Sequence, residues 1–396
     1  MVWFRYNVCV SWHIGIMNFQ SILKLIFEMG LKQKEIVALL DGMGFSISER
    51  HLRRFLSELN LKRRGPYSSS VVVTDFIRSE LQSSGKLHGY RWMHQKLLNN
   101  GLKVRKEDVR KVLQIMDPAG CVFRRRRRLY RRTYSAAGPH FTWHIDGYDK
   151  IKQFGFAISG CIDGFSRKLI WLKVYHTNND PRVIAGYFVE AMEEYCGMPQ
   201  LVRTDAGTEN VRVREILESV QATDGEKSEF ITGSSHSNQR IECFWGHLRK
   251  QCMEYWICLF HKLQDTGSYN GDFLDKNLMQ FCFMAIIQDE LDATFQTWNS
   301  HQIRTSGRGL PAGRPNVMMN APYLYSCRSF LKNVEQRQIQ MCRNLCEFRK
   351  NIPCDENVFE LCCIQMQEDG LVYPTKPRDA LEMYFHLREK IRNLVT

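Results

Sequence analysis

The residue pattern changes near Phe141, and this change constrains the fold more than any other feature of the chain. Before it, apolar residues recur at the three- and four-residue spacing of helices. After it come short runs rich in the residues that favour strands. These runs are 142–148, 154–163, 168–175 and 199–205. A helix is predicted at 181–197, because Pro181 can begin it and Gly197 can end it. Strands that alternate with helices predict a mixed α/β domain.

Helical spacing returns beyond the last predicted strand. It covers 211–220, one long segment at 237–263, a segment at 276–301 and most of the C-terminal residues, including 329–348. We therefore predict five regions. They are a helix-turn-helix region at 1–62, a second helical DNA-binding unit at 63–120, an Arg-rich linker at 121–140, an α/β catalytic core at 141–312 and a helical C-terminal region at 313–396.

The net charge of +13 is concentrated in one stretch of the 396 residues. Twelve lysines and arginines fall within residues 103–132, against three acidic residues. A positive charge so localised favours a polyanionic partner such as nucleic acid, with a merely soluble basic surface as the alternative. No apolar run approaches the roughly 18 residues of a membrane span, so no membrane partner is expected.

The segment before residue 60 predicts a DNA-reading element. Ser48 is the expected N-cap of a helix over 49–59. Leu52 begins the apolar face of that helix, so Arg53 and Arg54 point away from it. A helix, a tight turn and a basic second helix have helix-turn-helix geometry, whose last helix can enter a DNA major groove. A small helical bundle without DNA is the alternative.

A run of arginines separates the helical half from the strands. Like charges so close together cannot share a packed core, so they are solvated or bound to phosphate. We interpret the run as a linker along a nucleic-acid backbone and as a nuclear localisation signal, and we expect a nuclear protein. The residues are Arg124, Arg125, Arg126, Arg127, Arg128, Arg131 and Arg132.

Three acidic residues are candidates for the chemistry. Asp146 and Asp205 each follow a predicted strand, and α/β sheets commonly bind ligands where strands leave the sheet. Glu242 lies on the predicted long helix, with 36 residues between it and Asp205 (242 − 205 − 1). Carboxylates brought together repel one another, and a divalent cation reverses that penalty. Oxygen ligands suit Mg²⁺ or Mn²⁺, and such ions can support in-line phosphoryl displacement without a side-chain nucleophile.

These residues lie in motifs that resemble the DDE integrase and transposase superfamily. The matching stretches are "WHIDGY" around Asp146, "IDGFSRKLIW", "VRTDAGTEN" around Asp205, "SNQRIECFW" around Glu242, and "TWNSHQIR" at 297–304. The resemblance implies an RNase H-like mixed sheet flanked by helices. It also implies that Asp146, Asp205 and Glu242 are catalytic metal ligands for DNA strand cleavage and joining. The chain lacks the His/Cys zinc domain of retroviral integrases, so it is more similar to a transposon-derived or host-domesticated protein.

Residues near Glu242 and two further acids have separate predicted roles. Asn238 and Arg249 share the helix face of Glu242. We expect both to contact DNA, Asn238 by positioning a phosphate or a metal-bound water and Arg249 at the DNA backbone. Similar enzymes often carry a Lys one turn after the Glu, where this chain has Gly246. Asp163 precedes a Gly and is expected to shape a turn, and Asp149 is expected to be solvated.

Two function classes compete. The first is a Mg²⁺-dependent DNA integrase or transposase that acts on double-stranded DNA as a homo-oligomer, and the three intact acids favour it. The second is a domesticated, non-catalytic DNA-binding protein that uses the integrase core as an interaction module. A ribonuclease-like protein needs only the same fold, but the helix-turn-helix segments favour duplex DNA.

Overall fold

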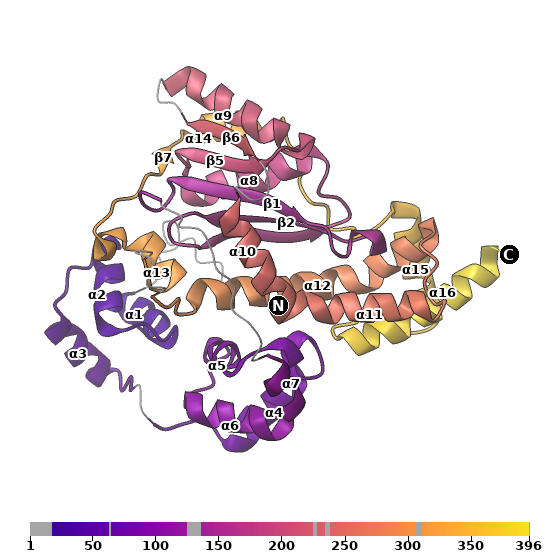
Figure 1. The fold of residues 1–396 in the computed structure, drawn as a ribbon, viewed down its shortest axis with the longest axis horizontal. Coiled ribbons are helices and arrows are strands. Elements are labelled where there is room, and N and C mark those ends of the chain that lie inside the picture. Colours follow the sequence, from indigo (N-terminus) through magenta and orange to yellow (C-terminus); the bar gives the residue numbers. More distant parts are fainter. Residues whose placement is uncertain are drawn as a thin grey trace.

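The computed structural model describes residues 18–62, 65–124, 136–224, 228–233, 238–305 and 311–395. In Figure 1 a twisted sheet occupies the upper part and the N-terminal helices lie below it. The last two helices, α15 (Glu356–Glu368) and α16 (Pro377–Val395), lie at the right beside the long helix α12 (Phe273–Ser300). The sheet carries the candidate catalytic residues, so its topology decides what the site can be.

The sheet has the RNase H-like arrangement that the resemblance implies. Its strands are β1 (Thr142–Tyr148), β2 (Ala157–Asp163), β3 (Leu169–Tyr175), β5 (Leu201–Asp205) and β6 (Glu229–Gly233). Strands β1, β2 and β3 form an antiparallel meander, whereas β5 and β6 lie parallel to β1 in the order β3-β2-β1-β5-β6. The strand β6 was not predicted from the sequence.

Helices cover both faces of the sheet, as Figure 1 shows. One face packs on α8 (Pro181–Tyr195), α9 (Val211–Asp224) and α14 (Gln336–Arg343). The other packs on α10, α11 and α12 (Phe273–Ser300). Successive strand residues face opposite sides, so Trp143 and Ile145 belong to the first layer and Tyr148 to the second. Asp146 therefore lies on the face that α10 covers.

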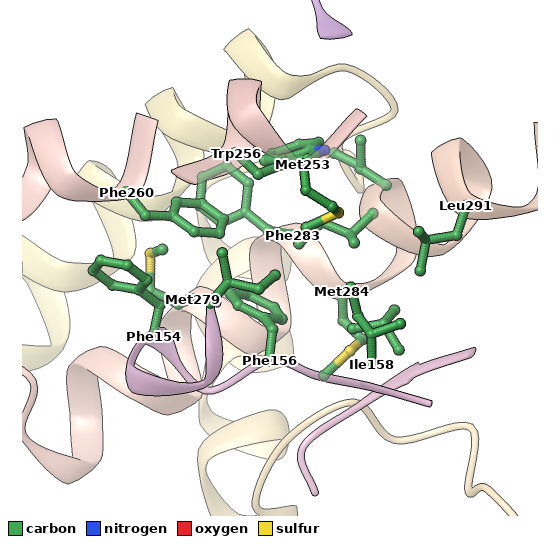
Figure 2. Close-up of a cluster of buried hydrophobic side chains, with 14 of the residues drawn as sticks. Phe154, Phe156, Ile158, Met253, Trp256, Phe260, Met279, Phe283, Met284 and Leu291 are labelled. Atoms are coloured by element: carbon green, nitrogen blue, oxygen red, sulfur yellow. The ribbon is translucent and has the colours of Figure 1, made fainter. Parts of the chain in front are cut away.

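The second layer holds a large aromatic core (Figure 2). Phe156, which leads into β2, stacks on Phe260 of α11 with ring centroids 5.3 Å apart. Trp256 packs edge-on against Phe283 of α12 at 6.0 Å. Buried aromatic residues contribute much of the free energy of such a core. The helices beneath the site are thus firmly tied to the sheet.

The long helix predicted at 237–263 is interrupted. The structure has α10 (Gln239–Leu248), a π-helical turn η5 (Arg249–Met253) and α11 (Glu254–Asp265). A π turn inserts one extra residue into a helix and rotates the turns beyond it. The apolar faces of α10 and α11 can therefore both meet the same core, and Cys252 and Met253 within the turn are buried there.

The edge strand β3 is closed by side-chain amides of α12. Gln288 accepts a hydrogen bond from Val174 N–H (3.0 Å) and donates one to the Leu172 carbonyl (3.2 Å). Asn299 accepts from Leu169 N–H (2.8 Å) and donates to the Leu169 carbonyl (3.1 Å). Backbone groups of an open edge would otherwise attract another strand. Here they are paired within the chain.

Two helical units precede the sheet. The first contains α1 (Phe19–Glu28), α2 (Gln33–Gly42) and α3 (Glu49–Glu58), and the second contains α4 (Ser70–Glu80), η1 (Ser84–Leu87), α5 (Tyr90–Asn99), α6 (Lys106–Met116) and α7 (Pro118–Phe123). Ser48 caps α3 as predicted, since its hydroxyl accepts a hydrogen bond from His51 N–H at 3.3 Å. The second unit has its own small apolar core, whereas the core of the first unit also includes Val317 and Ala321 from the C-terminal region.

The C-terminal region returns to the earlier parts of the chain. Its elements are α13 (Pro315–Asn320), η6 (Pro322–Tyr325), β7 (Lys332–Asn333), α14, α15 (Glu356–Glu368) and α16 (Pro377–Val395). The helix predicted at 329–348 is mostly absent, because β7 pairs with β4 (Gly197–Met198) and only α14 is helical there. Helices α15 and α16 pack on α12 and complete its core.

Short 3₁₀ turns connect several elements. They are η2 (Lys152–Phe154) and η3 (Thr208–Asn210), in addition to η1 and η6. Across the described parts of the chain, no helix is both long enough and apolar enough to cross a membrane.

Candidate active site

Two of the predicted acids lie side by side on neighbouring parallel strands. Trp143 pairs with Val202 and His144 pairs with Arg203. Each residue of β1 therefore lies beside the residue of β5 whose number is 59 higher (202 − 143). The same offset places Asp146 beside Asp205, at the last residue of β5. Neighbouring strands lie about 4.8 Å apart, so the two carboxylates emerge close together.

The third acid, Glu242, lies in the first turn of α10, which packs across β1 and β2. Burial raises the pKa of Asp146 to about 7, and the negative charges of Asp205 and Glu242 push it in the same direction. Burial also raises the pKa of Asp205. The three carboxyl groups therefore share one electrostatic environment, although they are far apart in the sequence.

The donor atoms and the charge of this group suit a divalent cation. Asp205 Oδ1 is buried and has no hydrogen-bond partner, and mutual repulsion disfavours three ionised carboxylates without a counter-charge. All three residues offer oxygen atoms, which Mg²⁺ and Mn²⁺ prefer. As the side chains stand in the described part of the chain, no three His, Cys, Asp or Glu residues already converge tightly enough to hold one ion. Binding would therefore require small side-chain rotations.

A tryptophan that the sequence analysis did not single out holds Asp146 in place. Trp245 Nε1 donates a hydrogen bond of 2.8 Å to Asp146 Oδ2. Trp245 lies three residues after Glu242, so both project from neighbouring positions of α10. Its ring crosses Gly160, which pairs directly with Asp146 on β2. A Cβ on Gly160 would lie 2.6 Å from that ring, so a glycine is required there.

Asn238 lies inside the protein rather than on a DNA-facing surface, which corrects the expectation of a DNA contact. Its amide donates to the Ile145 carbonyl (2.9 Å), so its Oδ1 must accept the hydrogen bond from His144 Nδ1 (2.6 Å). Burial lowers the pKa of His144 to about 3, so the ring is neutral. The nearby Asn238 amide also counteracts the burial that raises the pKa of Asp205. Asn238 therefore joins β1 to the start of α10.

The arginine predicted on the Glu242 face lies in the π turn. Arg249 is exposed and forms an ion pair with Glu254 at 2.7 Å. The hydrogen bond within this pair uses only Nε of Arg249, so the guanidinium keeps further N–H donors. Gly246 lies one turn after Glu242 and is exposed. A Cβ added at Gly246 would have no atom within 4 Å, so the surface of α10 is open at this position.

The predicted DNA-binding arginines fall into three groups. Arg53 and Arg54 project outward from α3, where they pair with Glu49 (3.6 Å) and Glu58 (3.5 Å). Arg124 is mostly buried and donates to Asp117 (2.6 Å) and to the Lys86 carbonyl, so it fastens the second unit and does not extend into solvent as expected. The remaining predicted contacts lie outside the described residues. They are Arg125, Arg126, Arg127, Arg128, Arg131 and Arg132.

The other acids near the strands have structural roles. The Asp163 carboxylate is buried and accepts hydrogen bonds from Ser166 N–H (2.7 Å) and from His140 N–H (2.7 Å), so it shapes the β2–β3 turn as expected. Asp149 is exposed and pairs with Lys152 at 3.1 Å. Neither carboxylate belongs to the Asp146 group.

An RNase H-like sheet with acids on β1, β5 and α10 is the arrangement that the resemblance to integrase cores implies. Comparison with known families agrees: residues 133–314 match the family described as "Integrase core domain". This part of the chain is therefore an integrase core domain of the DDE superfamily. Membership implies, at the level of the family, an integrase- or transposase-like role and polynucleotidyl transferase chemistry. The search of curated proteins found no match.

Proposed function

We propose that this chain binds double-stranded DNA and catalyses Mg²⁺-dependent strand cleavage and strand transfer. The observation that carries the proposal is the register of β1 and β5, which sets Asp146 beside Asp205 beneath the helix of Glu242. Divalent ions are the general cofactors of DDE domains, and a bound ion would activate the attacking oxygen and stabilise the leaving oxygen of a phosphodiester. Asp146, Asp205 and Glu242 are the residues that would hold it.

The protein prepares these carboxylates for a cation in two ways. Trp245 fixes one oxygen of Asp146 and leaves the other free to bind. Asn238 ties the start of α10 to β1 and thereby sets the position of Glu242 relative to the strands. Preorganised ligands lower the cost of ordering the site when substrate arrives.

DNA binding is proposed for the helical units and the Arg-rich linker. Helix α3 presents Arg53 and Arg54 outward, and α6 presents Arg110 and Lys111 near its middle. Phosphate contacts release counterions, so affinity should fall steeply with salt. Measuring duplex binding at several salt concentrations tests this. Replacement of both Arg131 and Arg132 by Ala should reduce the log–log slope by about 0.9 per lost contact, and an unchanged slope would argue against the linker.

The catalytic proposal is tested with the purified full chain and supercoiled plasmid in Mg²⁺ or Mn²⁺. Nicking or strand joining should require the metal and should disappear in Asp205→Asn. The matched control is Asp149→Asn, which removes an exposed carboxylate of the same domain. Strand chemistry that survives Asp205→Asn would refute the assignment of the site.

The domesticated, non-catalytic DNA-binding protein is a second candidate. It is favoured by the side-chain placement, since no described trio of acids already converges on one point and Trp245 occupies an oxygen of Asp146. It predicts salt-sensitive duplex binding without metal-dependent nicking, and binding that Asp205→Asn leaves unchanged.

Localisation and assembly follow from the same proposal. The Arg-rich linker should direct the protein to the nucleus, which a fluorescent fusion of the wild type and of a variant with Ala at Arg125 to Arg128, Arg131 and Arg132 can test. Strand transfer of two DNA ends needs two active sites, so we propose a homo-oligomer, and light scattering of the DNA-bound protein measures its mass.

A further inference from the structure

One buried arginine connects both helical units to the integrase core. Arg314 lies immediately before α13, and only 13% of its side chain is exposed. Its guanidinium donates to the Ser300 carbonyl at the end of α12 and to the Gly30 carbonyl just after α1 (3.0 Å). It also donates to the Gln95 side chain of α5 at 3.3 Å. These acceptors belong to the core, the first unit and the second unit.

Two of these acceptors are backbone carbonyls at or just beyond the C-terminal ends of helices. This explains why a cation is suited to the place where the two units meet the core, which we call the joint. The last carbonyls of a helix have no partner within the helix and carry its negative dipole end. Ser300 is the final residue of α12, and Gly30 follows α1 in a left-handed conformation (φ +78°) that closes the helix end. Arg314 therefore binds the last carbonyl of α12 and the carbonyl of the residue that follows the C-cap of α1, which belong to two different parts of the chain.

Neighbouring contacts show that the joint is built into the packing. Glu35 of α2 lies 3.9 Å from the guanidinium, so a carboxylate faces the buried charge. Asn99 of α5 hydrogen-bonds Ser300 at 3.5 Å. Tyr323, just after α13, donates to the Ala38 carbonyl of α2 at 2.7 Å. Both units thus meet the core within one small region, visible in Figure 1 where α1, α5 and α13 approach α12.

We propose that Arg314 is a positioning residue that fixes the two helical units relative to each other and to the catalytic carboxylates. The inference rests on the proposed function, because a fixed separation would set how far along the duplex the cleaved phosphate lies from the sequence that the units contact. The planar guanidinium of Arg can donate hydrogen bonds to acceptors in several directions at once. The ammonium of Lys is a compact charge that cannot reach all of these acceptors.

Hydrogen exchange of the full chain without DNA tests the positional claim. In Arg314→Ala, amides of residues 29–33 and 89–100 should exchange about tenfold faster, while those of β1 and β2 stay protected. Arg314→Lys should fold and give an intermediate increase at the same segments. The matched control is Arg388→Ala, which removes a comparably buried arginine that binds Asp275 far from both units.

Two results would overturn the inference. One is exchange in Arg314→Ala and Arg314→Lys that equals the wild type at both segments. The other is an increase spread equally over the sheet, which would mean general destabilisation. The same spread pattern in Arg388→Ala would show that loss of any buried arginine has this effect.

A DNA experiment separates this inference from the proposed function. An end-labelled linear duplex that the wild type cleaves is footprinted and mapped for nicks. Arg314→Lys should keep total cleavage but scatter the distance between footprint and nick, and a single unchanged distance contradicts the proposal. A wild type that never nicks DNA would refute the catalytic function, while the exchange experiment would still decide the role of Arg314.

Discussion

Replacing Asp146 with Asn should stabilise the folded protein at pH 8 in the absence of divalent ions. Burial, reinforced by the charges of Asp205 and Glu242, raises the pKa of Asp146 to about 7 from 3.8. Between these values the folded protein holds a proton that the unfolded chain releases. The contribution of Asp146 to the free energy of unfolding is therefore most favourable below pH 4. It is lost as the pH rises towards 7 and stays constant at higher pH. Asn removes this penalty because it has no charge.

The magnitude is set by the difference in pKa. A folded-state pKa higher by about three pH units corresponds to about 4 kcal/mol. Asp146 keeps some contact with water, so we expect roughly half of this value, about 2 kcal/mol. In a chain of this length 1 kcal/mol moves Tm by about 2 °C, which gives a rise of about 4 °C. Asn can still accept the hydrogen bond from Trp245, so the packing is kept.

Thermal denaturation with EDTA at pH 8 and pH 4.5 measures the effect. The variant should melt at a higher temperature than the wild type at pH 8 and at nearly the same temperature at pH 4.5, where Asp146 is protonated. Asp149→Asn serves as the control, since that carboxylate is exposed and should change Tm little at either pH. Equal melting of Asp146→Asn and wild type at pH 8 would show that the folded protein does not raise the pKa of Asp146.

Three further outcomes are expected. Mg²⁺ at about ten times its Kd should stabilise the wild type by about 1.4 kcal/mol, and Asp205→Asn should lose this gain in the same melting assay. Gly160→Ala should cost about 1–3 kcal/mol through overpacking against Trp245 and should abolish nicking, whereas retained nicking would mean that the indole does not position the site. Asn299→Leu should lower the free energy of unfolding by about 1–3 kcal/mol, because both backbone groups of Leu169 lose their partner; chemical denaturation with no change would contradict the role of that amide.

Much of the sheet, including the strands that carry Asp146 and Asp205, could be predicted from local patterns. The strands β1, β2, β3 and β5 are rich in strand-forming residues, and Asp146 and Asp205 follow recognisable runs. The resemblance then implied an RNase H-like mixed sheet, whereas the position of β1 between β2 and β5 comes from the structure. The register that sets the two aspartates together is visible only in the structure.

The features that were missed depend on distant contacts. The strand β6 is a short, half-exposed edge with little apolar pattern, and β5 alone holds it in the sheet. The π turn has no local signal, because it arises where two helices must face one core. The segment 329–348 has helical spacing, but pairing of β7 with β4 overrides it. Asn238 faces inward because His144 and Ile145 lie beneath it, and helical spacing alone cannot show this.

The two side-chain amides that bond the backbone of β3 also fix the number of residues between them on α12. Gln288 and Asn299 are eleven residues apart, about 16.5 Å along a helix and close to three whole turns, so both face the same side. The strand from Leu169 to Val174 covers about 16.5 Å as well. Both amides can therefore reach the backbone of β3 only when they lie eleven residues apart on the helix. Inserting or deleting one residue between the two amides would turn one of them by about 100°, so we expect related chains to vary in length elsewhere and to preserve this interval.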